Sequence, residues 1–394
     1  MKYLIMRTLS SFFLILVITA GCAGVEYETF EFTARNGNLS HDLVSVNVPI
    51  AGLSGGLCLE AGDVRIPAQA EPLTPTRARI WWFATQAEGE TVQYSVLHDQ
   101  TCAEQVYSWQ SAGDQSAQLV LGDHPLIQYE YPVFDPENKE ETKKPFHHVF
   151  GPASGELITK GAGGLFSHHR GIFYGYSRVE IYDDVYDMWH ANNGERTEHI
   201  DFVTEFSGPV FGGHVAEIHW KDPNDRIILE EERDIRVYRE PDGSMVIDFH
   251  TNMYAIAGPV NLDGDLQHAG MQFRAAQYVA DNPGVSRFIR PEALSDIPGD
   301  VELGEEDRIG LPWNAFNYTI GENEYTVVYM VNPANPGRSV AEMSERLYGR
   351  FGEFFPHYFS EGAPFVLRYR LWIVEGEAPA VEEIEAKYQQ YASR

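Results

Sequence analysis

Short runs in which apolar and polar residues alternate make up most of the chain, and they predict β-strands. "DLVSVNVPI", "RARIWWFAT" and "TVQYSVLHD" show this period of two within the first 118 residues. In residues 216–256, turns at 222–225 and 241–243 separate three longer strands. Helical periodicity is limited to residues 339–351 and to "AVEEIEAKYQQYA" at the C-terminus. The pattern predicts an all-β protein.

The strands divide into two expected domains. Residues 22–118 form a small N-terminal β domain, and residues 119–394 form a large antiparallel β-sandwich. The boundary falls near "SAQLVLG", where no low-complexity linker marks it. The larger domain carries most of the aromatic residues expected to fill a wide core or to stack on flat ligands.

The first 21 residues read as a secretory leader, with a short basic start and an apolar run that is short for a membrane-spanning helix. The leader ends in Thr19-Ala20-Gly21-Cys22, which resembles a bacterial lipoprotein box with Cys22 as the lipidated residue. The alternative is an ordinary signal peptide cut after Gly21 or Gly24. We expect an exported lipoprotein on the periplasmic face of a bacterial membrane, in the outer membrane, attached only through its lipid.

Charge and cysteine content narrow the function further. The chain has 58 acidic and 29 basic residues, a net charge of −29. Such a field repels nucleic acid, which is excluded as a partner. Cys58 and Cys102 remain after processing, and an oxidising periplasm favours a disulfide between them. Two separate buried thiols are the alternative.

Histidines gather in one third of the chain, where chemistry is therefore expected. Ten of the 14 histidines lie between His124 and His250. Two adjacent pairs stand in "KKPFHHVF" and "GLFSHHRG", each next to Gly-rich, loop-like sequence. Adjacent residues on a strand point to opposite faces, so only a strand end or loop lets both members of a pair face one pocket. Histidine transfers protons near neutral pH or binds metals.

The candidate site is built around "SHHRG". Arg170 carries a planar guanidinium suited to a carboxylate or to neighbouring hydroxyls, although an ion pair with one of the many carboxylates is the simpler alternative. The expected catalytic residues are His168, His169, Arg170, His148 and His199. The expected substrate-binding residues are His147, Trp189, Tyr174, Arg274 and Arg346. By base rate, Trp189 is equally well explained as a core residue.

A metal site is a separate alternative, and no cofactor is assigned from the sequence. One histidine of each pair and a third ligand such as His199 or Glu217 would hold a divalent ion, with His148, His168 and His169 as the first candidates. No zinc motif supports it, since His-Glu-x-x-His and Cys-x-x-Cys are both lacking. In "GHVAEIHW", Glu217 and His219 are expected on one strand face and His214, Ile218 and Trp220 on the other.

Several segments resemble the bacterial PmoA-like family in the order in which they occur. They are "GPASGELIT", "HHRGIFYGY", "GHVAEIHWKDP", "MVNPANPGRS…ERLYGRFGEF" and "LRYRLWIVEGE". The resemblance covers residues 30–375 and marks Gly171, Tyr348 and Gly349, among others, as family positions. This chain has Leu165-Phe166-Ser167 where the family usually has Asp-His-Pro, which weakens a three-histidine metal site inside that loop.

The resemblance implies an exported β-rich protein, similar in outline to the sugar-binding supersandwich of mutarotases and polysaccharide lyases. The methane oxygenase chemistry in the family name does not fit, because the chain has no apolar segment long enough to span a membrane after its leader. We therefore expect an enzyme acting on carbohydrate, a lyase, epimerase or hydrolase, in which histidine moves a proton and Arg170 holds the substrate. The alternatives are a non-catalytic glycan-binding lipoprotein and a His-ligated metal-dependent oxygenase or hydrolase.

Overall fold

The protein consists of two compact units. The computed structural model describes residues 28–35, 37–97 and 102–393. The first unit ends at Val106 and also takes in residues 208–210, and the second contains the rest of the chain from Tyr107. The expected leader (1–21) and Cys22 lie outside the described residues. The first unit ends about a dozen residues before the boundary expected at 118, because residues 107–113 form a strand that pairs within the second unit.

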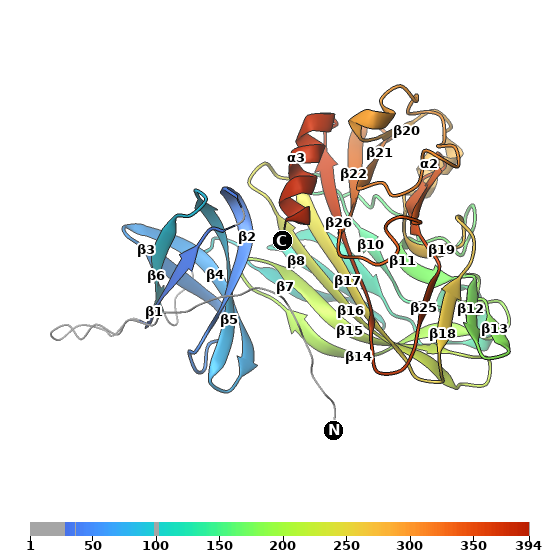
Figure 1. The fold of residues 1–394 in the computed structure, drawn as a ribbon, viewed down its shortest axis with the longest axis horizontal. Helices are drawn as coiled ribbons and strands as arrows, with labels where there is room; N and C mark the ends of the chain where they lie inside the picture. Colours follow the sequence, from blue (N-terminus) through green and yellow to red (C-terminus); the bar gives the residue numbers. More distant parts are fainter. Residues whose placement is uncertain (1–27, 36, 98–101, 394) are drawn as a thin grey trace. The chain divides into compact units, whose positions relative to one another are not determined.

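The first unit is one six-stranded antiparallel sheet in the order β1-β6-β3-β4-β5-β2 (Figure 1). Alternate residues along its strands are buried, as the period-two pattern predicts. The buried face is aromatic at its centre, where Trp82 packs edge-on against Phe30 and Phe32. The strands are β1 (Glu28–Thr33), β2 (Leu39–Val48), β3 (Gly55–Ala61), β4 (Val64–Thr74), β5 (Arg77–Gln86) and β6 (Thr91–Leu97).

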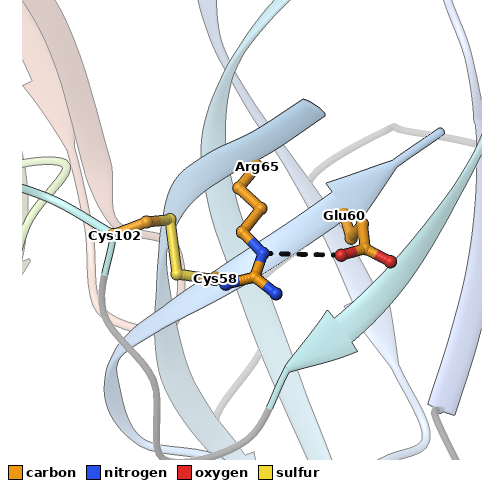
Figure 2. Close-up of a disulfide and its surroundings, with 4 residues drawn as sticks. All are labelled: Cys58, Glu60, Arg65 and Cys102. Carbon is orange, nitrogen blue, oxygen red and sulfur yellow. Dashed lines mark hydrogen bonds and ion pairs between the residues drawn. A yellow bond between two sulfur atoms is a disulfide. The ribbon is translucent and has the colours of Figure 1, made fainter. Parts of the chain in front are cut away.

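A disulfide closes the first unit. Cys58 of β3 is bonded to Cys102, which follows β6 in the chain (Figure 2). Cys58 also lies opposite Leu97 in the β3–β6 register, so the bond ties the end of β6 to the neighbouring strand. The exposed pair of Glu60 and Arg65, on adjacent β3 and β4, lies nearby and contributes little to stability.

The second unit contains two eight-stranded antiparallel sheets and one four-stranded sheet. The first large sheet has the order β23 (Glu342–Arg346), β24 (Arg350–Phe354), β19 (Ala269–Arg274), β11 (Gly171–Tyr176), β10 (Phe146–Val149), β9 (His124–Glu130), β8 (Ser116–Leu121) and β7 (Tyr107–Gly113). The second has the order β14 (Arg196–Phe206), β15 (Gly212–Lys221), β16 (Ile227–Arg239), β17 (Met245–Ala255), β26 (Phe365–Glu375), β22 (Asn323–Val331), β21 (Trp313–Ile320) and β20 (Ser286–Ile289). The small sheet has the order β13 (Asp184–Tyr186), β12 (Arg178–Ile181), β18 (Val260–Asp263) and β25 (His357–Phe359).

The two large sheets pack face to face as a β-sandwich. Tyr174 of β11 packs against Trp220 of β15. The hydroxyl of Tyr329 on β22 donates to the carbonyl of Met271 on β19 at 3.1 Å. Large aromatic residues of both sheets are buried between them, which is how two sheets form one core. The all-β fold with an antiparallel sandwich, expected from the alternating pattern, is confirmed.

The three strands expected in residues 216–256 are present as β15, β16 and β17, side by side in Figure 1. The C-terminal helix is also present as α3 (Val381–Ala392), which lies next to β22 and β26. Its Tyr391 ring covers the Arg370 guanidinium of β26, and its Glu385 accepts a hydrogen bond from Trp313 of β21. Two further helices are short, α1 (Lys139–Thr142) and α2 (Gln277–Asp281). None of the described helices is long and apolar enough to cross a membrane.

The helix expected at residues 339–351 is wrong. This segment forms β23 and β24, a hairpin that reverses just before Arg350. Gly349 has a φ of +101°, a value that suits this reversal and that side-chain-bearing residues rarely adopt. The edge of β19 supplies backbone partners for β24, so sheet pairing overrides the helical period of the sequence.

Reducing the Cys58–Cys102 disulfide should destabilise the first unit. The bond joins residues 44 apart in the sequence, and a native disulfide of this kind contributes about 2–4 kcal/mol, largely by restricting the unfolded chain. We expect faster amide hydrogen exchange in β3 and β6 on adding a reductant, measured by mass spectrometry. The same reductant should change nothing in the Cys58→Ser/Cys102→Ser variant. Unchanged exchange in the reduced wild-type protein would contradict this role.

Candidate functional site

Three histidines from separate loops of the second unit converge. His168 precedes β11, His190 follows β13, and His268 lies between β18 and β19. Each offers one ring nitrogen, and these three atoms lie within 4.8 Å of one another. The ring centroid of His190 lies 4.6 Å from that of His168 and 4.8 Å from that of His268. This is the spacing of a group that could close around one metal ion.

Two of the three rings are oriented by carboxylates. Nδ1 of His190 lies 2.7 Å from Oδ2 of Asp187, while Oδ1 of Asp187 accepts the backbone N–H of Trp189 and of His190. Nδ1 of His268 lies 2.9 Å from both carboxylate oxygens of Asp265. A carboxylate on Nδ1 fixes the tautomer and leaves Nε2 of each ring as the free ligand atom. Burial raises the pKa of Asp187, but the hydrogen bonds from His190 outweigh it and the pKa is lowered overall.

His168 completes the group without a protein partner for its ligand atom. Nε2 of His168 is buried and has no hydrogen-bond partner within the described part of the chain. Burial, with smaller effects from His190 and Lys144, lowers the pKa of His168 to about 3. The ring is therefore neutral at physiological pH, the form in which histidine binds metals. An orphaned buried nitrogen of this kind calls for a partner that the described protein atoms do not supply.

His169 lies next to the three-histidine group, and polar nitrogen atoms on its ring and on a neighbouring ring have no hydrogen-bond partner among the described residues. Its ring is 2% exposed, and neither ring nitrogen has a partner among the described residues. The ring lies 4.3 Å from that of His168, centroid to centroid, and 5.6 Å from that of Trp189, whose Nε1 is also buried and unpartnered. On another side it lies parallel to the ring of Tyr348, at 6.4 Å. Burial, then the charge of Arg350, lowers the pKa of His169 far below its usual range.

Arg170 does not face this group. Its Nη2 donates to the carbonyl of Glu140 at 2.6 Å and pairs with the Glu140 carboxylate at 3.4 Å. Nη1 reaches the carbonyl of Glu141, and the side chain is fully buried. Arg170 therefore forms the ion pair that was the simpler alternative to substrate binding. It holds the segment that precedes β10 against the loop before β11.

The expected single pocket is not formed, because the other predicted histidines lie elsewhere. Nε2 of His147 is 3.0 Å from Nε2 of His214, and the His147 ring stacks on Tyr129 at 4.5 Å. Nδ1 of His199 is 3.4 Å from the Tyr129 hydroxyl. Burial lowers the pKa of His214 to about 3, so this group is a set of neutral rings inside the sandwich. No contact joins it to His168 among the described residues.

Three other predicted residues, His148, Tyr174 and Arg346, have partners within the protein, and Trp189 lies in the core. Nδ1 of His148 lies 3.0 Å from the Thr159 hydroxyl, and burial lowers its pKa to about 4. Tyr174 donates to the hydroxyl of Tyr176 in the core. Arg346 pairs with Glu302 at the surface. Trp189 belongs to a buried hydrophobic cluster, in agreement with the alternative that it is a core residue. Its ring also lies next to that of His169.

The sequence reasoning missed His190, His268 and their two aspartates. A signal was present: "DMWH" (187–190) and "DLQH" (265–268) are both Asp-x-x-His, and each forms a tight turn in which the aspartate binds the histidine three residues later. Arg350 was missed because its segment was read as a helix. Such a turn motif is weak alone and gains meaning only when two of them meet in space.

A second group of potential ligands lies on β15 and β16. Nε2 of His219 is 2.9 Å from Glu217, and Glu230 lies within reach. All three side chains are partly exposed on the outer face of the sheet. His214, Ile218 and Trp220 are fully buried on the other face, which confirms the alternation expected in this strand. The group is a solvated cross-strand arrangement without an orphaned buried atom.

A comparison with known protein families finds a match that covers most of the second unit. Residues 116–389 match the family described as "Family of unknown function (DUF6807)". The match covers more than half of the chain and includes all three converging histidines, so the protein belongs to this family. No curated protein matches the chain.

Replacing Arg170 should weaken the fold. In Arg170→Met, the carbonyls of Glu140 and Glu141 lose a charged donor, and we expect the free energy of unfolding to fall by about 2–3 kcal/mol, as for buried hydrogen bonds to a charged group. Urea-induced unfolding measures this. Arg178, whose side chain is 57% exposed in a pair with Glu180, gives the control, with a change below about 0.5 kcal/mol in Arg178→Met. Equal stability of the two variants would show that Arg170 is not structural.

Proposed function

We propose that the protein is a metal-dependent enzyme in which His168, His190 and His268 hold one divalent transition-metal ion. The single observation that carries this is the convergence of three ring nitrogens, two of them oriented by the Asp187 and Asp265 carboxylates. Carboxylate-oriented histidines of this kind surround metal ions in many proteins. Three imidazoles suit zinc, copper, iron or nickel, and we take zinc as the first ion to test.

Three protein ligands leave coordination positions for water and substrate, which is the arrangement of catalytic rather than structural zinc sites. A bound ion would polarise a substrate oxygen or lower the pKa of a bound water. For ideal tetrahedral binding the ligand nitrogens approach to about 3.3 Å, so the three rings need small rotations from their present spacing. His169, beside His168 and without a partner on either ring nitrogen, is placed to donate to or accept from a bound substrate.

We propose a carbohydrate as the substrate and a hydrolase or lyase reaction. Support comes from the predicted export as a lipoprotein and from the segments that resemble the PmoA-like family, whose β-rich members suggest sugar-binding sandwiches. We do not propose that Arg170 binds the substrate, because its guanidinium already donates hydrogen bonds to the carbonyls of Glu140 and Glu141.

Metal content tests the proposal. Full-length protein prepared from the periplasm without an affinity tag should contain, or take up, about one ion per chain, measured by elemental mass spectrometry. His190→Ala should lose that ion. His219→Ala is the control, since it removes the histidine of the other candidate group and should leave the metal content unchanged. A metal-free wild-type protein that takes up none on reconstitution with zinc, copper or iron would overturn the proposal.

The orienting carboxylates should tune metal affinity without being ligands. In Asp265→Asn, the His268 ring exchanges a charged carboxylate acceptor for a neutral amide whose NH₂ group cannot accept, and zinc should bind about 10- to 100-fold more weakly. Competition with a chromogenic chelator measures this. Asp263→Asn is the matched control: Asp263 lies two residues away, and its carboxylate accepts from the Gly264 N–H and contacts none of the three histidines within the described residues. Equal affinities for zinc in the two variants would show that Asp265 does not act through His268.

A further inference from the structure

Two buried arginines next to the three-histidine group have no carboxylate partner. Seven arginines are buried among the described residues, and five of them form an ion pair: Arg170, Arg196, Arg233, Arg290 and Arg370. Arg274 and Arg350 are fully buried and form none. In a chain with 58 acidic residues, a shortage of carboxylates does not explain the difference. A buried charge without a counter-charge is unfavourable, so some compensation is expected.

The two arginines are neighbours. Arg274 and Arg350 lie directly opposite each other in the β19–β24 register, where like charges repel. Arg274 donates through Nη1 to the carbonyls of Ala275 and Tyr348. Arg350 donates through Nη1 to Gln272 at 3.0 Å and through Nε to the Tyr348 hydroxyl at 3.2 Å. These acceptors are neutral. Asp281 attracts Arg274 and Glu302 attracts Arg350 only from beyond ion-pair distance, so neither guanidinium has a carboxylate in contact among the described residues.

Donors remain free on both side chains. Nη2 of Arg274, Nε of Arg274 and Nη2 of Arg350 are buried and have no partner in the described residues. Burial lowers the pKa of Arg274 to about 10. Tyr348 acts in the opposite direction and raises this pKa, whereas the positive charge of Arg350 lowers it further. Two guanidinium groups with one unused Nη2 each match a group with two acceptor oxygens.

Tyr348 and His169 connect the arginines to the three histidines. The Arg274 guanidinium lies 5.2 Å from the Tyr348 ring centroid. The His169 ring lies parallel to that of Tyr348 and touches His168. Phe166, on the Gly-rich loop before His168, contacts both Tyr348 and His169 and is 45% exposed, so it is the outermost ring over this place.

We infer that Arg274 and Arg350 bind a carboxylate of the substrate, so that the sugar acted on beside the three histidines is an acidic one, of the uronic acid class. The ligand supplies the counter-charge that the protein withholds at this one buried position. A planar carboxylate uses both free Nη2 donors at once, and a neutral sugar would leave both charges buried and unpaired. This inference names the substrate class and rests on the proposed function for its setting.

Binding of uronates to the zinc-reconstituted full chain tests it. Ligand-observed NMR titration should show D-glucuronate or D-galacturonate binding at least about tenfold more tightly than D-glucose, the loss expected when a buried charged hydrogen bond has no partner. Glucose 6-phosphate serves as the other anion and should bind less tightly than the uronate. Arg350→Met and Arg274→Met should each remove the preference for the uronate. Arg178→Met is the control, because Arg178 pairs with Glu180 at the surface, and this variant should keep the preference.

Thermal unfolding distinguishes a binding role from a structural one. Removing one of two repelling buried charges should leave the melting temperature of Arg350→Met equal to or above that of the wild type. A large decrease in Arg350→Met would show that this arginine serves the fold and would overturn the inference. Arg274→Met is not used in this comparison, because it also removes a donor from the carbonyls of Ala275 and Tyr348. Equal binding of uronate and glucose, or tighter binding of the phosphate ester, would also overturn it. If the protein prefers uronate but never binds metal, the carboxylate site stands and the proposed metal enzyme is refuted. If the protein binds metal at the three histidines but shows no uronate preference, the metal site stands and the carboxylate site is refuted.

Discussion

The organisation of the second unit depends on how the sandwich compensates charge inside its core. A guanidinium buried between two sheets is costly unless a carboxylate and hydrogen bonds compensate its charge. Arg233 with Glu231, Arg290 with Glu345 and Arg370 with Asp248 obey this rule within the described residues. The same rule makes the exception informative: where Arg274 and Arg350 stand without a carboxylate, the protein has kept a place for an external anion.

Sheet topology explains how the chemistry meets there. β11, β19 and β24 are adjacent in one large sheet, yet they come from distant parts of the sequence. The antiparallel register places the loop before β11 and the hairpin of β24 at one end of these strands, because Gly171 lies opposite Arg274 and Arg274 opposite Arg350. His268 precedes Ala269 at the other end of β19, so it is the loops, and not strand pairing, that bring its ring to 6.0 Å from that of His168. The Asp-x-x-His turns then fix the ring directions, which strand geometry alone does not do.

Much of the fold could be predicted from the sequence, and less of the site. Period-two alternation identified the strands, and the faces assigned to His214 and His219 were correct, because side-chain direction on a strand is a local property. The helix expected at 339–351 failed since pairing with β19 decides that segment. The grouping of His147 with His168 failed for a related reason: which strand ends meet is set by non-local pairing. His190 and His268 were overlooked because their aspartates acquire meaning only once the turns converge.

The central claim is that His168, His190 and His268 form one metal centre in the second unit. Anomalous X-ray diffraction from crystals of zinc-reconstituted protein, measured on both sides of the zinc absorption edge, tests it most directly. We predict a single strong anomalous peak among the three Nε2 atoms. A peak at Glu217, His219 and Glu230 alone, or no ordered zinc between the three histidines at saturating concentration, would contradict the account.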